Sequence, residues 1–228
     1  QAAADSLTVT PAISSVGTGA GTINVAVTSN VSWTVGDDAP WLTVSPASGS
    51  NNGKFTISYQ SNTSASARTG TVTITGGGIT RTVTVNQGFI TVTPATVNVS
   101  PGAGTGQTFT VSSNVSWSVS DDAPWLAASV TNGSNNQTVT ISYNANSGAA
   151  RTGIITITDG GISRTVTVNQ GFLIATPTPL NVSVVCDSGD ILSITSNVSW
   201  TITENLSWIS FNPTSGSNSA NTAAYCTD

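Results

Sequence analysis

The sequence lacks most of the side chains that carry out chemistry. It has no histidine and no methionine, and only 7% of its 228 residues are charged. Without histidine there is no Ser-His or Cys-His catalytic pair, and the serines lie in Thr/Ser-rich segments with no base nearby. We therefore expect no enzymatic activity and no catalytic residue. The sequence also points to no cofactor-binding or metal-binding residue.

Basic residues are scarce and scattered singly along the chain. Five Lys and Arg against ten Asp and Glu give a net charge of -5, and no basic patch could neutralise a run of phosphates. Nucleic acid is therefore excluded as an expected partner. No apolar run approaches the ~20 residues of a membrane-spanning helix. Residues 1–5 lack the charged head and apolar core of a signal peptide, which fits a mature, exported chain and would equally fit a sequence that begins inside a longer one.

Threonine, serine, asparagine, glycine and valine are abundant instead, and they alternate with a period of two. Thr71–Thr75 and Arg81–Val85 place polar and apolar residues in turn, as strands with one buried face do. Gly76–Gly78 lies between these two runs and predicts a hairpin. The sequence therefore predicts an all-β protein with essentially no helix.

The chain repeats itself. Ser29–Trp33 returns as Ser113–Trp117 and again as Ser196–Trp200, at spacings of 84 and 83 residues. About seven short strands in each repeat suit a two-sheet sandwich. We predict tandem immunoglobulin-like antiparallel β-sandwiches arranged as a rod. The first repeat spans residues 7–88, the second 89–171 and the third 172–228.

The motifs of the repeats resemble the BACON domain. The first repeat carries the resemblance in Asn30–Trp33, Asp37–Leu42, Ser45–Gly49, Ala67–Gly70 and Val83–Gln87, and the second in Asp121–Leu126, Ala150–Gly153 and Val166–Gln170. The family name describes a Bacteroidetes-associated, presumed carbohydrate-binding module. The resemblance implies an exported protein of a Bacteroidetes-like bacterium or of a phage that infects one.

The third repeat is incomplete, because the Arg-Thr-Gly segment and the last two strands have no counterpart before Asp228. A sandwich without them exposes core and sheet edges. Three explanations fit: the sequence is part of a longer parent chain, a neighbouring copy supplies strands in an end-to-end assembly, or the third repeat folds differently. The expected partner is therefore another copy of this protein or the rest of a longer chain.

Both cysteines, Cys186 and Cys226, lie in the third repeat, where the first two repeats have residues such as Gln60 and Asn144. A disulfide between them would stabilise the domain by roughly 4 kcal/mol and would fit an oxidising compartment. The alternative is two unpaired thiols. A zinc site is less favoured, since two cysteines without histidine do not complete one.

The junctions between repeats carry apolar residues where a free linker would be rich in Gly and Ser. These residues are Phe89 and Ile90 at the first junction, and Phe172 and Leu173 at the second. We expect them to pack at the domain interfaces and to limit bending.

Tryptophan provides the candidate contacts for a glycan or a partner. Trp33, Trp117 and Trp200 lie in phase with apolar neighbours and are expected in the core. The second set is Trp41, Trp125 and Trp208. Leu42 and Val44 take the inward phase, so a regular strand would expose Trp41, and an exposed indole can stack on a sugar ring. The alternative is an indole under the adjoining loop. Exposure would favour glycan binding, and burial would favour a spacer.

Two further motifs are charged. The acidic pairs Asp37-Asp38 and Asp121-Asp122 are adjacent, so in an extended chain their side chains point to opposite faces and do not converge as a glycosidase pair must. We expect a solvated capping turn, with weak calcium binding as the alternative. Arg68 and Arg151 are expected to pair with a nearby carboxylate or carbonyl.

The sequence therefore predicts a non-enzymatic extracellular structural protein: a stalk, a fibre or filament subunit, or an adhesin segment, on a cell surface or in a phage virion. The alternative is a carbohydrate-binding module that recognises host or dietary glycans and is appended to a glycoside hydrolase.

Overall fold

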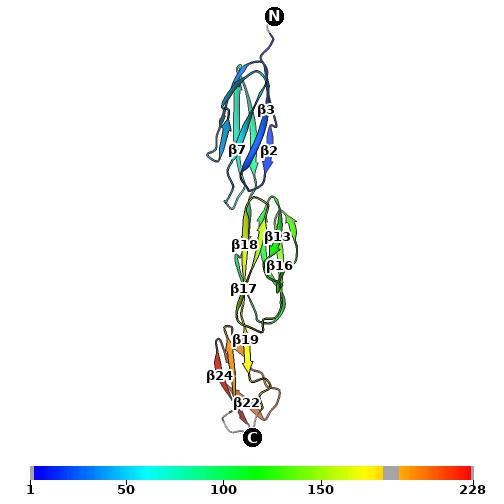
Figure 1. The fold of residues 1–228 in the computed structure, drawn as a ribbon, viewed down its shortest axis with the longest axis vertical. Helices are drawn as coiled ribbons and strands as arrows, with labels where there is room; N and C mark the ends of the chain where they lie inside the picture. Colours follow the sequence, from blue (N-terminus) through cyan, green and yellow to red (C-terminus); the bar gives the residue numbers. More distant parts are fainter. Residues whose placement is uncertain (1–2, 182–189, 227–228) are drawn as a thin grey trace.

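The computed structural model of the chain describes residues 3–181 and 190–226. These residues form strands joined by turns and loops, and no stretch of them is helical, so they contain no helix that could span a membrane. The strands build three modules that follow one another along the long axis of an elongated molecule (Figure 1). The predicted all-β fold of tandem immunoglobulin-like sandwiches is confirmed.

Two sheets form the first module. One sheet has the order β1 (Leu7–Thr10), β3 (Gly21–Ser29), β7 (Gly53–Tyr59), β5 (Leu42–Ser45). The other has the order β2 (Ile13–Val16), β9 (Ile79–Gln87), β8 (Arg68–Gly76), β4 (Ser32–Asp37), β6 (Ser48–Ser50). The predicted glycine hairpin joins β8 to β9, which pair along their whole length.

The module has nine strands where the sequence predicts about seven. One reason is that the first strand divides at Pro11, which cannot donate a hydrogen bond to a ladder. Before Pro11, β1 pairs antiparallel with β3; after it, β2 crosses to the other sheet and pairs in parallel with β9. The short strand β6 adds the second extra element.

The second module repeats this plan. Its first sheet has the order β10 (Ile90–Thr93), β12 (Gly104–Ser113), β16 (Gln137–Tyr143), β14 (Leu126–Ala128). Its second sheet has the order β11 (Thr96–Val99), β18 (Ser163–Gln170), β17 (Arg151–Thr158), β13 (Ser116–Asp121), β15 (Asn132–Ser134). A bulge in β12 leaves out Gly106, which has φ 102°. This one extra residue accounts for the 84-residue spacing between Ser29–Trp33 and Ser113–Trp117.

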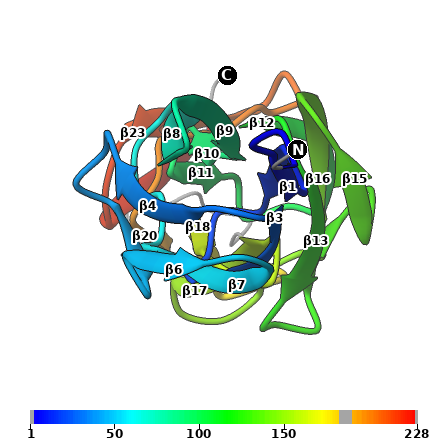
Figure 2. The same cartoon turned by 90° about the horizontal axis from the view of Figure 1, so that it is seen from above.

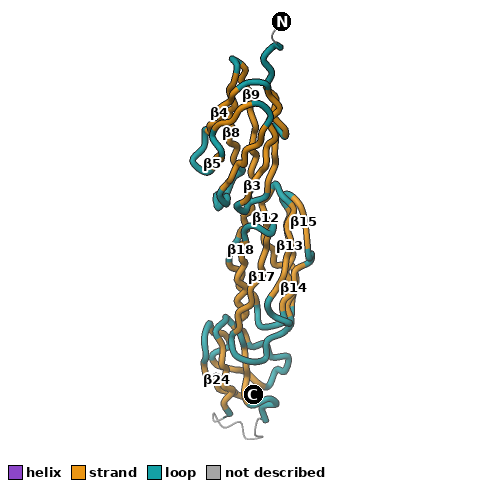
Figure 3. The backbone as a smooth tube through the Cα atoms, turned by 45° about the horizontal axis from the view of Figure 1, so that its top comes forward, coloured by secondary structure: helices purple, strands orange, loops and turns teal. Residues whose placement is uncertain are grey.

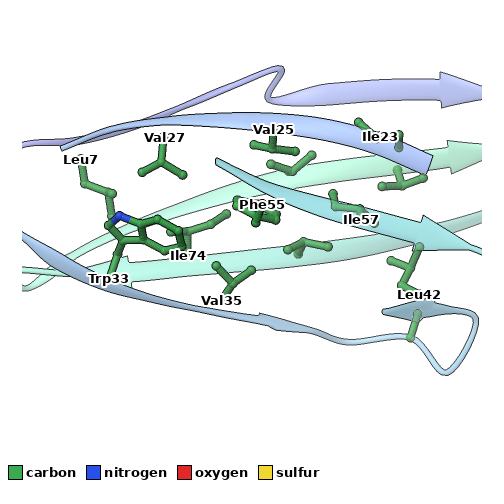
Figure 4. Close-up of a cluster of buried hydrophobic side chains, with 14 of the residues drawn as sticks. Leu7, Ile23, Val25, Val27, Trp33, Val35, Leu42, Phe55, Ile57 and Ile74 are labelled. Carbon is green, nitrogen blue, oxygen red and sulfur yellow. The ribbon is translucent and has the colours of Figure 1, made fainter. Parts of the chain in front are cut away.

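Alternate residues of the strands fill the cores of the first and second modules, and Figure 4 shows the core of the first. In the first module Val25, Phe55 and Ile74 are buried, and Trp33 lies among them. The Trp33 indole Nε1 donates a hydrogen bond to the carbonyl of Asn51 at 3.0 Å, so its polar atom is satisfied. Trp117 and Trp200 are also buried and make the equivalent bond to Asn135 and Asn218. All three are core residues, as predicted.

The third module has one complete sheet, in the order β19 (Leu173–Thr176), β20 (Ile191–Ser196), β24 (Ala220–Cys226), β22 (Ile209–Asn212). A short pair, β21 (Trp200–Thr201) and β23 (Ser215–Gly216), lies beside it. Within residues 173–181 and 190–226 no strand corresponds to the hairpins β8–β9 and β17–β18.

The register of this sheet corrects one alignment made from the sequence. Ile209 faces Cys226 as Leu42 faces Tyr59, so Cys226 corresponds to Tyr59 and not to Gln60. Cys186 lies outside the described residues, and so does the side chain of Cys226. The disulfide between them therefore stays a prediction.

The modules are joined with almost no linker. Only Gly88 and Phe89 separate β9 from β10, and only Gly171 and Phe172 separate β18 from β19. Seen along the long axis, the three modules overlap in projection, so the chain advances along one axis (Figure 2). The loops at the base of one module meet the turns at the top of the next (Figure 3). The contacts at these two junctions therefore determine how far one module can bend against the next.

Candidate functional site at the first module junction

The second set of tryptophans is positioned by a turn and not by strand alternation. Pro40 takes the second position of a turn in which the amide of Leu42 donates to the carbonyl of Ala39 at 2.9 Å. The turn directs Trp41 inward, where it is only 9% exposed. The guanidinium carbon of Arg68 lies 4.3 Å from the centre of the indole ring. One ring face is therefore covered by the cation, and Trp41 is not an open stacking surface.

Trp125 has the same surroundings and Trp208 does not. Trp125 is half-buried, with the guanidinium carbon of Arg151 at 4.4 Å from its ring centre. Trp208 is 49% exposed, and no arginine covers it in the described part of the third module. The three candidate contact residues therefore fall into two classes.

Arg68 also binds the base of its own module, as expected for a pairing with a carbonyl. Its Nη2 donates to the carbonyl of Gln60 at 2.6 Å, and its Nε donates to Oε1 of Gln87 at 2.8 Å. Burial lowers the pKa of Arg68 from its ordinary value. The amide nitrogen of Gln87, which is buried, donates to the carbonyls of Thr18, Gly19 and Gln60. Gln87 is thus the centre of the network that closes this end of the sandwich.

The second module repeats this network with Arg151 and Gln170. Arg151 Nε donates to Oε1 of Gln170 at 2.8 Å, and the Gln170 amide donates to the carbonyls of Ser100, Pro101 and Asn144. Both glutamines stand in the Asn-Gln motif that ends each repeat. The repeated Asn-Gln motif was therefore visible in the sequence, but the sequence did not show that its glutamine binds the loops at the base of the module.

One member of each acidic pair caps a strand, as expected. Oδ1 of Asp38 accepts a hydrogen bond from the amide of Thr71 at 2.7 Å, and Oδ1 of Asp122 accepts one from the amide of Ile154 at 2.7 Å. Asp37 and Asp121 are exposed. No group of three or more His, Cys, Asp or Glu side chains is gathered around a possible ion in the part of the chain that the structure describes.

The residues predicted to pack at the junctions take different places. Ile90 lies in the core of the second module, and Leu173 is 43% exposed. Phe89 and Phe172 are half-buried. The amide of Phe89 donates to Oδ1 of Asn114 at 3.0 Å, which ties the linker to the turn at the top of the second module. Ile90 therefore serves the core of its own module, and packing of Phe89 and Phe172 at the junctions stays a prediction.

Glycine is required in the linker because the next module approaches so closely. A Cβ atom at Gly88 would overlap Cγ1 of Val115, and one at Gly171 would overlap Cγ1 of Val198. The amide of Gly88 donates to the carbonyl of Val16 at 3.0 Å, so the linker also remains bound to the module before it. Both glycines are thereby held between two modules.

Asn62 fixes the other side of the linker, and sequence reasoning missed it. Its side chain is buried, and its Nδ2 donates to the carbonyls of Gly88 at 2.7 Å and Ser66 at 2.9 Å. Asn146 does the same for Gly171 at 2.9 Å. The two asparagines occupy equivalent places three residues after Tyr59 and Tyr143, so comparison of the repeats could have found them.

The tip of the β17–β18 hairpin reaches back to the base of the first module. Oδ2 of Asp159 accepts a hydrogen bond from the amide of Thr18 at 2.7 Å, and Oδ1 accepts one from its hydroxyl at 2.6 Å. Thr18 is fully buried. The equivalent hairpin of the first module has Gly76 at the position of Asp159. This contact is therefore not shared by every hairpin.

Two more contacts accompany it. Arg164 donates from Nη2 to the carbonyl of Thr63 at 2.9 Å and from Nε to the carbonyl of Ile90 at 2.9 Å, so it links the two modules. Gly19 and Gly161 pack backbone to backbone, since a Cβ on Gly19 would lie 2.7 Å from Cα of Gly161. We refer to these residues as the junction cluster: Thr18, Gly19, Thr63, Asp159, Gly161 and Arg164.

The junction cluster favours the charged form of Asp159. Burial raises the pKa of Asp159, but hydrogen bonds from the hydroxyl and amide of Thr18 and from the amides of Ile162 and Gly161 lower it more. The net pKa is therefore below its ordinary value. A carboxylate that accepts this many donors binds Thr18 most strongly when it is ionised.

The second junction is built differently. Pro101 stands at the position of Thr18, and it has neither an amide hydrogen nor a hydroxyl to donate. An open polar groove of about 470 Å³ lies there between the two modules, lined on one side by Asn98 and Arg151 and on the other by Asn197. The hairpin that carries Asp159 and Arg164 at the first junction also has no counterpart in the described part of the third module.

Comparison with known families assigns the chain. Residues 6–90 match a family model described as a viral BACON domain, and residues 115–171 match the BACON model described as a putative N-terminal binding domain. The chain therefore carries BACON domains in tandem. No curated protein matches the chain.

Solved structures with a similar fold include three of different kinds. A xyloglucanase from Bacteroides ovatus in complex with a heptasaccharide is 19% identical, with a TM-score of 0.35, and the match covers 44% of this chain and 21% of that one. The adhesin InvE of Yersinia pseudotuberculosis is 13% identical over 89% and 71%, with a TM-score of 0.29. An I-band fragment of titin is 10% identical over 100% and 90%, with a TM-score of 0.42. These likenesses concern the fold alone.

Proposed function

We propose that this array of BACON domains is a non-catalytic spacer, a stalk or fibre segment that holds its two ends apart outside a cell or on a virion. The observation that carries the proposal is the junction cluster, in which Asp159 and Arg164 of the second module bind two different loops of the first. A spacer needs this kind of contact, because stacked modules joined only by a short linker would bend.

The positions of the contacts argue for stiffness in more than one direction. Thr18 lies in the loop after β2 and Thr63 in the loop after β7, while Gly88 forms the covalent link. Three separate points of attachment define a plane, so bending or rotation of the second module has to break at least one of them. The backbone contact between Gly19 and Gly161 leaves no space for the modules to slide.

The surface chemistry supports a mechanical role over glycan binding. The indole of Trp41 is buried beneath Arg68, and Trp125 is covered in the same way. The rest of the surface of these modules is rich in Thr, Ser and Asn, and it carries few charges. A location outside the cell agrees with this composition and with the match of the first module to a viral BACON domain.

Distance measurement between spin labels tests the proposal in the full chain. Cys186 and Cys226 are replaced by Ser, and labels are attached to Thr73→Cys and Thr165→Cys, which are exposed positions on the first and second modules. We expect a narrow distance distribution in this parent and a broad one after Asp159→Ala. The matched control is Asp121→Ala, which removes an exposed carboxylate of the same module and should leave the distribution narrow. A broad distribution in the parent itself would refute the spacer.

A further inference from the structure

The third module exposes apolar residues whose counterparts in the other modules are buried. The first strand of each module begins with Leu7, Ile90 or Leu173; the first two are 1% and 0% exposed, and Leu173 is 43% exposed. The difference does not arise from the residue type, because Leu7 and Leu173 are the same. It arises from what covers them.

The turn before β22 shows the same contrast. Trp208 corresponds to Trp41 and is 49% exposed where Trp41 is 9% exposed. Leu206 corresponds to Ala39 and is also exposed. These two residues and the free edge of β21 are called the open face below, while Leu173 lies in β19, at the other edge of the four-stranded sheet.

In the first module strand β8 covers Trp41 and Ala39, and its sequence is adapted to them. Arg68 lies over the Trp41 ring, and two residues later Gly70 passes so close that a Cβ there would lie 2.9 Å from Cζ2 of Trp41 and 2.6 Å from Cδ1 of Leu42. Arg151 and Gly153 meet Trp125 and Leu126 in the same way in the second module. A strand that covers a Trp in this turn therefore needs an arginine to lie over the indole ring and, two residues later, a glycine to pass close to it.

The third module also has a group that can accept the backbone hydrogen bond that β8 donates in the first module. The amide of Thr71 donates to Oδ1 of Asp38, and Asn205 stands at the equivalent position with a side-chain oxygen that can accept the same bond. Strand β4 pairs with β6 on one side and β8 on the other, whereas β21 pairs only with β23 among the described residues. The residues of β4 that pair with β8 correspond to 201–204, of which Thr201 ends β21, so an added strand would pair with Thr201 and extend β21 beyond it.

Charge favours an arginine at this place. All five Lys and Arg residues of the sequence lie before residue 165, so the third module has none, while it carries Glu204 close to Trp208. Because the module has no cation of its own, the exposed indole of Trp208 is free to form a cation–π contact with an arginine from a bound segment.

We propose that the open face binds a two-stranded antiparallel β-hairpin whose first strand begins with Arg-x-Gly and continues with alternating apolar residues, as residues 68–87 do. The arginine stacks on Trp208, the glycine passes over Trp208 and Ile209, and the strand adds to the free edge of β21. This inference does not rest on the stiffness of the first junction, since it concerns the other end of the chain.

A synthetic peptide of residues 68–87 tests it against the full chain. Fluorescence quenching by acrylamide reports on Trp208, whose contribution is identified by subtracting a Trp208→Phe variant. Binding should lower the quenching of Trp208 by up to about fivefold, the ratio of its exposed fraction to that of Trp41, 49% to 9%. The Gly70→Val peptide should not bind, because its side chain meets the indole. The Thr73→Val peptide changes only the outer face of the strand and should bind as the parent does.

A covalent version covers the case in which the free peptide does not fold. Residues 60–87 are attached directly after Cys226, which is in register with Tyr59. Protection of Trp208 and slower hydrogen exchange of β21 are expected, and Gly70→Val in the added segment should abolish both. An added segment that leaves Trp208 as open as in the parent overturns the proposal. So does dimerisation of the unmodified chain with Trp208 protected, since a second copy would then cover the open face.

Discussion

The carboxylate of Asp159 accepts two hydrogen bonds from Thr18, at 2.7 Å from the amide and 2.6 Å from the hydroxyl, although 141 residues separate them in the sequence. The contact joins two modules that each have a complete core of their own. It therefore adds little to the folding of either module, and its effect is on how one module is oriented against the other.

The first prediction concerns pH. The pKa of Asp159 in the closed junction is below its ordinary value of 3.8, and in an open junction it returns toward that value. The closed junction therefore has its full stability above the ordinary pKa and loses it as the pH falls through the lowered one. In the spin-labelled chain we expect a constant narrow distribution from neutral pH down to about pH 5, and broadening only below about pH 4.

An Asp159→Asn variant separates this effect from general acid unfolding. Its amide cannot ionise and offers one acceptor oxygen in place of two, so the junction should be weakened equally at every pH. Circular dichroism checks that the sandwiches themselves remain folded at each point. Broadening of the parent distribution near neutral pH, or an identical pH profile for the two proteins, would show that Asp159 is not the titrating group.

The second prediction concerns the linker glycine. A Cβ at Gly88 would overlap Cγ1 of Val115, so Gly88→Ala should push the second module away and destabilise the closed junction by about 1–3 kcal/mol. Gly36→Ala is the matched control, because no atom lies within 4 Å of a Cβ at that position. Amide chemical shifts of residues on both sides of the junction should move in the first variant and remain in place in the second.

Shortening the opposing side chain should rescue the junction. Val115→Ala removes Cγ1, the atom nearest the new methyl group, while Oδ1 of Asn114 stays 3.0 Å from it, so the double variant should regain part of the parent shifts and of the narrow spin-label distribution. The parent, the two single variants and the double variant form a double-mutant cycle, whose coupling free energy measures the interaction between residues 88 and 115. If the two substitutions are additive, Gly88 is required for some reason other than Val115.

Repetition in the sequence was enough to predict the modules and their cores. Val25, Ile74 and Trp33 follow a period of two within segments that recur at fixed spacing, and such a pattern is typical of tandem β-sandwiches. The division of the first strand at Pro11 was harder to foresee, since a change of sheet partner depends on β9, far along the chain. The exposure of Trp41 could not be decided because Pro40 replaces the strand by a turn.

The junction was least predictable for a physical reason. Its contacts join residues that are unrelated in the repeat pattern, such as Arg164 and the carbonyl of Thr63. Every residue has a backbone carbonyl, so residue types do not show which carbonyl accepts such a bond. Ile90 gave a misleading signal, because it is apolar for the core of its own module. Asn62, by contrast, recurs as Asn146, and a comparison of polar positions between repeats would have identified it.

The third prediction concerns Asn62. Its buried side chain holds the carbonyl of Gly88, so Asn62→Ala leaves that group without its donor and should cost about 1–3 kcal/mol. Hydrogen exchange of the amide of Gly88, which donates to Val16, should become faster in the full chain. Asn52→Ala is a control at the opposite end of the same module, where the side chain accepts from Ser29, and it should leave Gly88 unchanged. Equal acceleration by both variants would indicate global loosening of the module.

The fourth prediction concerns the stacking of Arg68 on Trp41. Arg68→Ala removes the cation from the ring, worth about 0.5–2 kcal/mol, and deprives the buried Oε1 of Gln87 of its donor, worth about 1–3 kcal/mol. Since Gln87 also binds three carbonyls at the base of the module, the loss should appear there first. Hydrogen–deuterium exchange of strands β8 and β9 in the full chain should accelerate at the ends nearest Arg68 and Gln87.

Two variants show whether geometry or charge accounts for the loss. Arg68→Lys keeps a cation near the ring but cannot bond both Gln87 and the carbonyl of Gln60 in the same fork, so it should recover only part of the protection. Arg81→Ala removes an exposed arginine from strand β9 of the same sheet, and its effect should stay within about 0.5 kcal/mol. If Arg68→Ala were as mild as Arg81→Ala, the covered tryptophan would be held by its turn alone. The Arg-x-Gly pattern would then be needed for its glycine and not for its arginine.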